Sequence, residues 1–323
     1  MTSTVWFVGV STAESTVNHA FPIWMADLGL DVRLVGRDLP LGAPAVLYRT
    51  LVEELAADSG SLGAVITSHK VALLAGAGDL IGRLDPLAAE CGEVNALSRR
   101  SEGLAGFARD PVSVGRVVDR IWPDGEQVVC LGAGGTAIAL GRHLLARPVP
   151  PTRLVFTDRH GGAVDHLRSV LGPWAADRRV RLEAHVGAGP WDGPVERSPA
   201  GTLVVNATGL GKDRPGSPLS PVAAFPPGAV VWELNYRGDL SVLRQARRTD
   251  GVAVHDGWEL FCHGWAAALG PILDLPGEAH TADRFAALAA PLRSAQPVSD
   301  ARHNSTTSSA HPQDSVTPAP PCP

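Results

Sequence analysis

A glycine-rich turn after an apolar run is the feature that most constrains how this chain can fold. The turn has the spacing G-x-G-x-x-A, follows the apolar run at 128–131, and precedes a segment with helical periodicity. The first glycine permits a tight turn, the second lets a pyrophosphate approach the backbone, and the alanine lets helix and strand pack closely. Free N–H groups at the helix start attract phosphate. We therefore expect a dinucleotide to bind here, a nucleotide-free glycine-rich turn in an α/β domain being the alternative. The expected contacts are Gly132, Ala133, Gly134, Gly135, Thr136 and Ala137.

A charged pair stands at the end of the next expected strand, about 20 residues beyond the turn, as the dinucleotide fingerprint requires. Asp158 directly follows this strand, and Arg159 comes next. A carboxylate at this point accepts hydrogen bonds from ribose hydroxyls and repels a 2′-phosphate, whereas an arginine favours that phosphate. Because Asp158 lies closer to the strand end, we expect NAD rather than NADP, and Arg159 could equally stack on the adenine ring.

Apolar runs of strand length alternate along the chain with helix-length periodic segments. Such alternation is typical of α/β folds in which parallel sheets are covered by helices. The segment 173–199 is too rich in Pro, Gly and Trp to assign, and the Ser/Thr/Pro/Ala-rich residues 294–323 are expected to form a disordered tail. We expect strands at 5–10, 32–35, 62–66, 128–131, 154–156, 203–206 and 230–234, and helices at 16–28, 46–57, 110–121 and 134–146.

The bulk properties exclude several classes of protein. The chain has 323 residues, 45% of them apolar, and a net charge of −5, which fits a soluble protein with two domains. No basic run supports nucleic-acid binding, and no apolar stretch is long enough to span a membrane. Four dispersed cysteines lack the spacing of a zinc site, so we expect no metal and a reducing, cytoplasmic compartment.

Lysine is almost absent from this chain. Only two of the 28 basic residues are lysines, Lys70 and Lys212, so 26 are arginines. Arginine stays protonated in proteins, whereas a desolvated lysine can release its proton. Lys70 follows the apolar run 62–66 and a polar turn, which indicates either an active-site amine or an ordinary surface lysine. Lys212 follows a strand-end loop and is interpreted as a solvated residue, with a contact to nicotinamide or ribose as the alternative.

Several short motifs, in the correct order over about residues 5–270, resemble those of the shikimate dehydrogenase family. The resemblance implies an N-terminal α/β substrate domain with an inserted Rossmann-type, doubly wound parallel sheet. The implied boundaries are 1–112 plus 256–293 for the substrate domain and 113–255 for the dinucleotide-binding domain. The family patterns N-V-T-x-P-x-K, G-A-V-N-T, G-x-N-T-D, N-R-T, N-x-T-x-x-G and D-G-x-x-M-L resemble segments 64–70, 92–96, 106–110, 158–160, 206–211 and 256–261.

The resemblance implies that Lys70 and Asp110 form the catalytic pair. A hydride would pass between nicotinamide and the carbon that bears a ring hydroxyl or ketone, while Lys70 shuttles the proton of that oxygen. Asp110 would hold the ammonium, although an Asp before Pro111 also fits a helix N-cap. Burial lowers the pKa of a lysine and a nearby carboxylate raises it, and the sequence leaves open which effect is larger.

The departures from the family patterns fall on groups that would hold the substrate. In the segment that resembles S-x-S-P, residues 13–16, one hydroxyl is missing, and the Asn and Thr before the lysine become Ala64 and Ile66. The family's substrate glutamine falls on Gly264, beside His263. Because a changed set of hydrogen-bonding groups selects a different ligand, we expect shikimate not to be the preferred substrate. The expected substrate contacts are Ser15, Thr67, Ser68, Asn95, Tyr236 and His263, and the resemblance adds Asn206, Thr208 and Gly257 to the cofactor contacts.

The sequence thus predicts an NAD(P)-dependent dehydrogenase of secondary metabolism that acts on a polyhydroxylated or amino-substituted carbocycle, as a monomer or homodimer. One alternative is a non-catalytic dinucleotide- or metabolite-binding regulator on the same scaffold. Retention of both Lys70 and Asp110 favours the enzyme, because binding alone does not need the pair. A methylene-tetrahydrofolate dehydrogenase-like enzyme is the other alternative, and the motifs around Asn95 and Asp110 speak against it.

Overall fold

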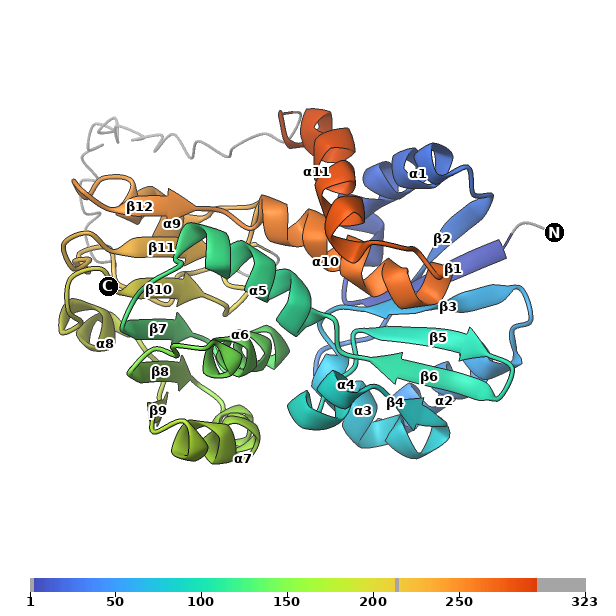
Figure 1. The fold of residues 1–323 in the computed structure, drawn as a ribbon, viewed down its shortest axis with the longest axis horizontal. Coiled ribbons are helices and arrows are strands. Elements are labelled where there is room, and N and C mark those ends of the chain that lie inside the picture. Colours follow the sequence, from blue (N-terminus) through green and yellow to red (C-terminus); the bar gives the residue numbers. More distant parts are fainter. Residues whose placement is uncertain (1–2, 213–214, 295–323) are drawn as a thin grey trace, which may run out of the picture.

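Two six-stranded sheets lie side by side, with helices over their faces (Figure 1). The computed structural model describes residues 3–212 and 215–294. The tail expected at 294–323 lies outside the described residues from 295 onward, and Ser294 itself is the last residue of a helix. The domain boundaries given above stay a prediction, although each sheet is built from one continuous part of the chain.

The first sheet is mixed, with strand order β2-β1-β3-β5-β6-β4. β1, β2 and β3 run parallel, whereas β5 is antiparallel to both β3 and β6. The alternation of strands and helices predicted parallel sheets, and β5 departs from that expectation. The physical reason is the short connection 101–102, because two strands joined by a tight turn must pair antiparallel. The strands are β1 Ser3–Gly9, β2 Val32–Asp38, β3 Ser61–Ile66, β4 Arg83–Leu84, β5 Ala96–Arg100 and β6 Gly103–Phe107.

The second sheet is parallel throughout, with strand order β12-β11-β10-β7-β8-β9. From β7 the chain winds outward in one direction through β8 and β9, then returns to β10 and winds the other way. This is the doubly wound order in which ligands bind at the carboxyl ends of the two central strands. The predicted fold class is confirmed. The strands are β7 Gln127–Leu131, β8 Arg153–Asp158, β9 Arg181–Val186, β10 Leu203–Asn206, β11 Val230–Glu233 and β12 Ala253–His255.

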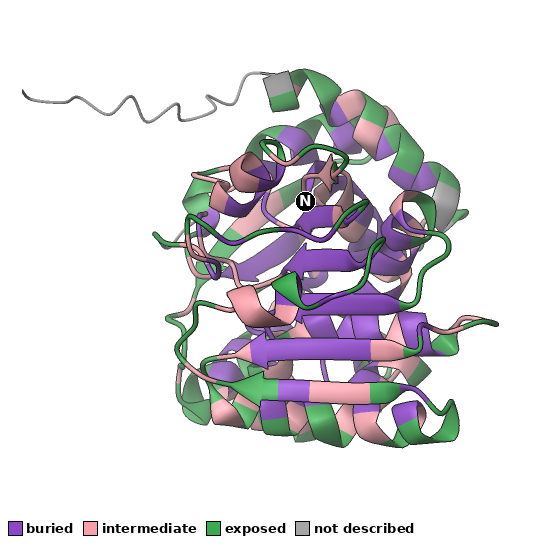
Figure 2. Ribbon diagram, turned by 90° about the vertical axis from the view of Figure 1, so that its left-hand side faces the viewer, coloured by how far each residue is buried: buried purple, intermediate pink, exposed green. Residues whose placement is uncertain are grey.

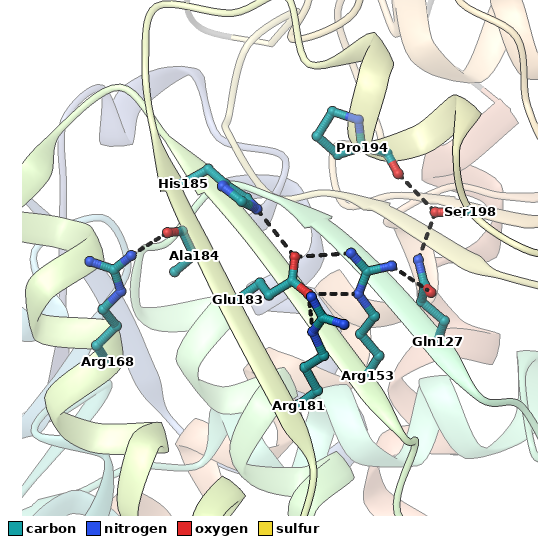
Figure 3. Close-up of polar contacts among 9 residues, drawn as sticks. All are labelled: Gln127, Arg153, Arg168, Arg181, Glu183, Ala184, His185, Pro194 and Ser198. Atoms are coloured by element: carbon teal, nitrogen blue, oxygen red, sulfur yellow. Dashed lines mark hydrogen bonds and ion pairs between the residues drawn. The ribbon is translucent and has the colours of Figure 1, made fainter.

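The central strands of the second sheet are buried, and its edge strands are more exposed (Figure 2). At the β9 edge, Arg153 donates two hydrogen bonds of 2.9 Å to Glu183, and Arg181 approaches the same carboxylate (Figure 3). Charged side chains of this kind on an edge strand oppose pairing with another chain. The β9 edge is therefore exposed to solvent, and it is the edge of the sheet opposite to β10–β12.

The helices agree with the predicted ones where the sequence was periodic, and several others were not predicted. α5 has the expected bounds, and the unassigned segment 173–199 contains the end of α7, β9 and α8. None of the described helices has both the length and the apolar character needed to cross a membrane. The helices are α1 Val17–Leu28, α2 Ala45–Ala57, α3 Lys70–Ala77, α4 Pro86–Cys91, α5 Asp110–Ile121, α6 Gly135–Ala146, α7 Gly161–Asp177, α8 Asp192–Glu196, α9 Ser241–Ala246, α10 Trp258–Leu273 and α11 Glu278–Ser294.

The last two helices return to the first sheet. α10 packs against α5, β3 and β5, and α11 packs on α1 (Figure 1). Trp265 of α10 meets Phe7 of β1 edge-on, with ring centroids 5.0 Å apart, and Phe285 of α11 stacks on Trp24 at 4.5 Å. Such aromatic pairs add to the apolar burial that holds a core together. The return places the start of α10 between the two sheets, beside the cavity described next.

Candidate active site

A cavity of about 210 Å³ lies between the two sheets. The first sheet contributes residues that follow β1 and β3, and the second contributes residues that follow β7, β10 and β11. α5 and α10 complete its wall. The cavity therefore lies at the carboxyl ends of strands from both sheets, which is where open α/β sheets bind their ligands.

Lys70 and Asp110 meet at this cavity. Lys70 is the first residue of α3, and its ammonium forms an ion pair with the carboxylate of Asp110, the first residue of α5. The two side chains are only 14% and 10% exposed. Asp110 does not cap the helix, because Arg109 holds the N-cap position and the Asp110 carboxylate turns instead toward Lys70. The N-cap interpretation of Asp110 is thus wrong.

Two further residues fix the geometry of the pair. Asn95 donates a 2.6 Å hydrogen bond to the second oxygen of Asp110, and its own carbonyl accepts the backbone N–H of Arg109 at 2.7 Å. Thr136, in the glycine-rich turn, has its hydroxyl 3.5 Å from the Lys70 ammonium and 3.4 Å from Asp110. Asn95, which precedes β5 of the first sheet, therefore holds the pair in place. Thr136, in the expected cofactor turn after β7 of the second sheet, contacts it from the opposite side.

The pKa of Lys70 lies above its ordinary value. Burial alone would lower it, but the negative charges of Asp110 and Glu93 and the hydrogen bond to Asp110 outweigh that effect. The balance that the sequence left open is thus decided in favour of the ammonium form. The raised pKa favours the ammonium form of Lys70 at neutral pH, and the neutral amine becomes populated when the pH is raised or a ligand changes its surroundings.

Glu93 is a second acid beside the pair, and the sequence reasoning missed it. It is fully buried, and neither carboxylate oxygen has a hydrogen-bond partner among the described residues. Burial, together with the charge of Asp110, raises the pKa of Glu93 to about 8, while Lys70 opposes the shift. The available signal was that the family motif G-A-V-N-T has alanine where this chain has Glu93.

A second cavity, of about 440 Å³, adjoins the first and lies over the glycine-rich turn. Its lining combines the start of α6 with Ala207 after β10 and the start of α7. A side chain on Gly132, whose φ is +115°, would bring Cβ to 2.7 Å from the carbonyl oxygen of Ala207. At Gly134 the space is open, so an anion can approach the helix start. These features fit a dinucleotide pyrophosphate.

Gly132→Ala is expected to raise the dissociation constant for the dinucleotide by roughly tenfold or more, because strain and overlap displace the turn. Titration of tryptophan fluorescence with NAD(H) and NADP(H) measures the constant. Gly172→Ala in α7 is the matched control, since a Cβ there meets nothing within 4 Å. Equal dinucleotide affinity in both variants and the wild type would contradict the assigned role of the turn.

The expected cofactor residues beyond the turn have different surroundings. The Asp158 carboxylate accepts the backbone N–H groups of Ala133 at 3.0 Å and His160 at 2.9 Å, so it is anchored at the end of β8. The exposed Arg159 bonds to the ring of His160. Asn206 donates to buried Glu233 at 2.6 Å and accepts the Thr208 hydroxyl at 2.7 Å. Asn206 and Thr208 therefore shape the loop after β10, and neither lines the two cavities.

Most of the expected substrate residues line the first cavity. Asn95 does so together with Ser15, Thr67, Ser68 and Tyr236, and Gly257, expected as a cofactor contact, lines the same cavity. His263 does not: it is buried away from the cavity, with Nε2 3.8 Å from the carboxylates of Glu259 and Asp283. Because successive helical residues point in different directions, the cavity receives Gly264 and Trp265 instead. Burial, with nearby Arg116, lowers the pKa of His263 to about 4.

Two cations at the cavity were not among the expected site residues, although a contact of Lys212 with nicotinamide or ribose was the alternative given above. Lys212, interpreted above as a solvated loop residue, lines the first cavity, and so does Arg237 beside Tyr236. The Lys212 ammonium lies 6.0 Å from the centre of the Tyr236 ring. The available signal was the rarity of lysine, because both lysines of the chain are at this one cavity.

Comparisons with known proteins give a consistent picture. No family model matches the chain. The shikimate dehydrogenase (NADP(+)) of Rubrobacter xylanophilus is 30% identical over 268 residues, spanning 79% of this chain and 85% of that protein. The shikimate dehydrogenase (NADP(+)) of Symbiobacterium thermophilum is 31% identical over 229 residues, spanning 66% and 73%. The structure of quinate dehydrogenase from Corynebacterium glutamicum in complex with NAD matches with a TM-score of 0.68 at 21% identity, covering 88% of this chain and 99% of that one.

The protein has a doubly wound sheet with a glycine-rich turn, and across a cavity from it a mixed sheet that carries a lysine–aspartate pair. These features define a two-sheet α/β protein of the dinucleotide-binding class. Within that class the relatives make the assignment specific. The chain belongs to the shikimate dehydrogenase family. The resemblance drawn from the short motifs is thereby confirmed.

Proposed function

We propose that this protein is an NAD(P)-dependent dehydrogenase that interconverts a hydroxyl and a ketone on a shikimate-like or cyclitol-like carbocycle. The observation that carries the proposal is the ion pair of Lys70 and Asp110 at a cavity shared by both sheets, within 3.5 Å of the Thr136 hydroxyl of the glycine-rich turn. Membership of the shikimate dehydrogenase family supports the reaction class. A regulator that only binds ligand would not need a buried, charged pair beside the turn.

In this mechanism Lys70 handles the proton of the reacting oxygen. When bound, the nicotinamide dinucleotide supplies or accepts the hydride at the substrate carbon. During reduction the Lys70 ammonium donates a hydrogen bond and then a proton to the carbonyl oxygen, and during oxidation the neutral amine takes the hydroxyl proton. Asp110 orients the ammonium, and Asn95 fixes Asp110. Leu260, Phe261 and Trp265 give the cavity an apolar wall that limits access of water.

The raised pKa of Lys70 gives the two directions different pH dependences. We expect kcat/KM for alcohol oxidation to rise from about pH 6 to about pH 10, because the base form of Lys70 becomes populated as the pH approaches its pKa. Over the same range kcat/KM for ketone reduction should stay nearly constant, because the raised pKa keeps Lys70 in its acid form. Initial rates at 340 nm in both directions test this. A reduction rate that rises with pH would contradict the assignment of the proton to Lys70.

For the cofactor we propose NAD in preference to NADP. The anchored Asp158 carboxylate supports this choice, since it places a negative charge where a 2′-phosphate would lie. The curated relatives above are named for NADP(+), and the solved quinate dehydrogenase is a complex with NAD. The ratio of kcat/KM for the two dinucleotides, with the same alcohol, decides the preference.

The test of the proposed function is a turnover panel. Purified full-length protein is assayed with each dinucleotide against shikimate, quinate and a set of neutral and amino-substituted cyclitols. We expect turnover of at least one carbocycle and weak activity on shikimate, because several substrate-holding groups differ from the family patterns. Efficient shikimate oxidation would contradict the altered specificity. Tight dinucleotide binding without turnover of any carbocycle would favour the regulator.

A further inference from the structure

We propose that Glu93, buried between the Lys70–Asp110 pair and the start of α6, is a positioning residue that couples occupation of the dinucleotide site to the proton on Lys70. The inference rests on the proposed function and deepens it, because Lys70 is the residue that handles the substrate proton there. It also goes beyond the family motifs, since the pattern G-A-V-N-T has alanine and not an acid at this position.

The loop that carries Glu93 is fixed beside the pair. The backbone N–H of Val94 donates to the carbonyl oxygen of Lys70 at 3.3 Å. The side chain of Asn95 donates a 2.6 Å hydrogen bond to the carboxylate of Asp110. Both anchors lie within two residues of Glu93, so the backbone of Glu93 keeps a set position next to both members of the pair.

The Glu93 carboxylate lies against the first residue of α6. A Cβ on Gly135 would overlap Oε2 of Glu93 and would lie 3.6 Å from Cδ of Lys70. A Cβ on Gly134, one residue earlier, would meet nothing within 4 Å. The start of α6 thus has Glu93 on its Gly135 side and open space for a pyrophosphate at Gly134. When a dinucleotide is bound, the positive end of one helix therefore lies beside two groups that can carry negative charge.

Glu93 is a costly residue to place here. It is fully buried, and within residues 3–212 and 215–294 neither of its carboxylate oxygens takes part in a hydrogen bond. A buried polar group without a hydrogen bond destabilises a fold, and acids with a changed proton affinity are typical of functional sites. Burial and the charge of Asp110 raise the pKa of Glu93 to about 8, while Lys70 opposes the shift. Glu93 can therefore change its charge near neutral pH inside the site.

The groups around Glu93 come from every element that packs near it. They are Lys70 from α3, Cys91 and Glu90 from α4, Asp110 from α5, Arg142 from α6, which pairs with Glu90, and His166 from α7, which lies against Gly92. Burial and the charge of Glu93 raise the pKa of the Cys91 thiol to about 12, and burial lowers the pKa of His166. Near pH 8 the thiol therefore stays protonated and the imidazole stays neutral, so neither group mimics the titration of Glu93.

The charge of Glu93 acts on Lys70 through space. Burial opposes the ammonium form of Lys70, and the negative charges of Asp110 and Glu93 outweigh that opposition. An ionised Glu93 therefore strengthens the hold of Lys70 on its proton. A pyrophosphate at the same helix start disfavours a second negative charge, so it favours neutral Glu93. In the occupied site Glu93 thus keeps its own proton to a higher pH, and over that range its pull on the Lys70 proton is absent.

The scarcity of lysine allows a direct test by NMR. Protein labelled with ¹³C at the lysine Cε has two such side chains, Lys70 and Lys212, and Lys212→Met identifies the signal of Lys70. In the wild type the Lys70 signal should shift in two steps as the pH rises. The first is a small step near pH 8 as Glu93 ionises, and the second is a large step above the ordinary lysine pKa of 10.5. In Glu93→Gln the first step should be absent, and the second should move down by about one pH unit.

Glu90→Gln is the matched control, because it removes one negative charge three residues before Glu93 from a side chain that is paired with Arg142. It should leave both steps in place. Glu93→Ala, which restores the alanine of the family pattern, is a second variant with the same expectation as Glu93→Gln. A single step in the wild type would overturn the proposal, and so would a step near pH 8 that survives in either Glu93 variant.

The dinucleotide arm uses NADH, whose reduced nicotinamide ring carries no charge. Saturating NADH should move the first step of the wild type to higher pH, because the pyrophosphate disfavours ionised Glu93. By linkage, the dissociation constant for NADH should rise by about tenfold between about pH 7 and pH 10 in the wild type, and much less in Glu93→Gln. A first step that NADH leaves in place, or equal pH dependence of the dissociation constant in both proteins, would overturn the coupling.

These measurements separate the inference from the proposed function, because neither needs turnover. A coupled titration of Glu93 and Lys70 in a protein that turns over no carbocycle supports the inference while the proposed function fails. A Lys70 signal that is indifferent to Glu93 in a protein that does turn over a carbocycle overturns the inference and leaves the proposed function in place.

Discussion

Replacing Lys70 with methionine should lower kcat by about 10³-fold and leave dinucleotide affinity unchanged, because general acid–base groups contribute about 10²–10⁴-fold to turnover. Methionine keeps the length and apolar character of the lysine stem but has no proton to give. The proposed site of the dinucleotide is centred on the turn 132–137, and Lys70 only borders that cavity, so dinucleotide binding should persist. Single-turnover rates of dinucleotide reduction, together with fluorescence titration, measure the two quantities separately.

The second lysine provides a matched control for the first. Lys212→Met makes the same chemical change at the same cavity, but we expect it to preserve most of kcat, because the Lys212 ammonium lies at the Tyr236 ring and not beside Asp110. Asp110→Asn should resemble Lys70→Met, because the amide no longer holds the ammonium in place. Wild-type kcat in Lys70→Met would contradict the assigned role directly.

Glu93→Gln should stabilise the folded protein by on the order of a few kcal/mol near pH 8, and much less near pH 5. Above the ordinary pKa of 4.5 the unfolded chain has released the Glu93 proton, whereas the folded protein holds it up to about pH 8. Folding stability therefore falls as the pH rises through this window. A buried amide has no charge to desolvate, so the variant lacks that loss. Urea unfolding at both pH values measures the difference.

Glu90→Gln is the control for this effect. Glu90 lies on α4, three residues before Glu93, but is 33% exposed and pairs with Arg142 at 2.7 Å. Partly exposed ion pairs contribute about 0–1 kcal/mol, so its removal should change stability little and with no strong pH dependence. The groups that surround Glu93 are Lys70 from α3, Asp110 from α5 and the start of α6 at Gly135. Identical pH profiles for the wild type and Glu93→Gln would show that Glu93 is not a buried acid.

The parts of the site that the sequence predicted are those whose signal is local. Six consecutive residues determine the geometry of the glycine-rich turn. The strand before it, β7, and the helix after it, α6, lie within one residue of the expected bounds. Lys70 and Asp110 belong to separate motifs, and the family resemblance brought them together. The hairpin of β5 and β6 was missed because its strands are short and joined by two residues, which leaves little periodicity to read.

The parts that could not be predicted depend on contacts across the two sheets. The fold brings the Tyr236 hydroxyl to Ser15 and Thr16, more than 200 residues away in sequence. Glu93 lies in a short loop with no local signal, and its burial depends on Asp110 and Gly135, which pack beside it in the fold. His263 was expected at the cavity because it is next to Gly264 in the sequence. Neighbouring residues of a helix point in different directions, so Gly264 lines the cavity and His263 does not.

The most direct test of the central claim is a crystal structure of the protein with its dinucleotide and the carbocycle that it turns over. We expect the reacting oxygen about 2.6–3.2 Å from the Lys70 ammonium, with Asp110 still paired to Lys70 and the pyrophosphate on the turn 132–137. A substrate bound in the cavity with its reacting oxygen on another group, and Lys70 out of reach, would contradict the claim.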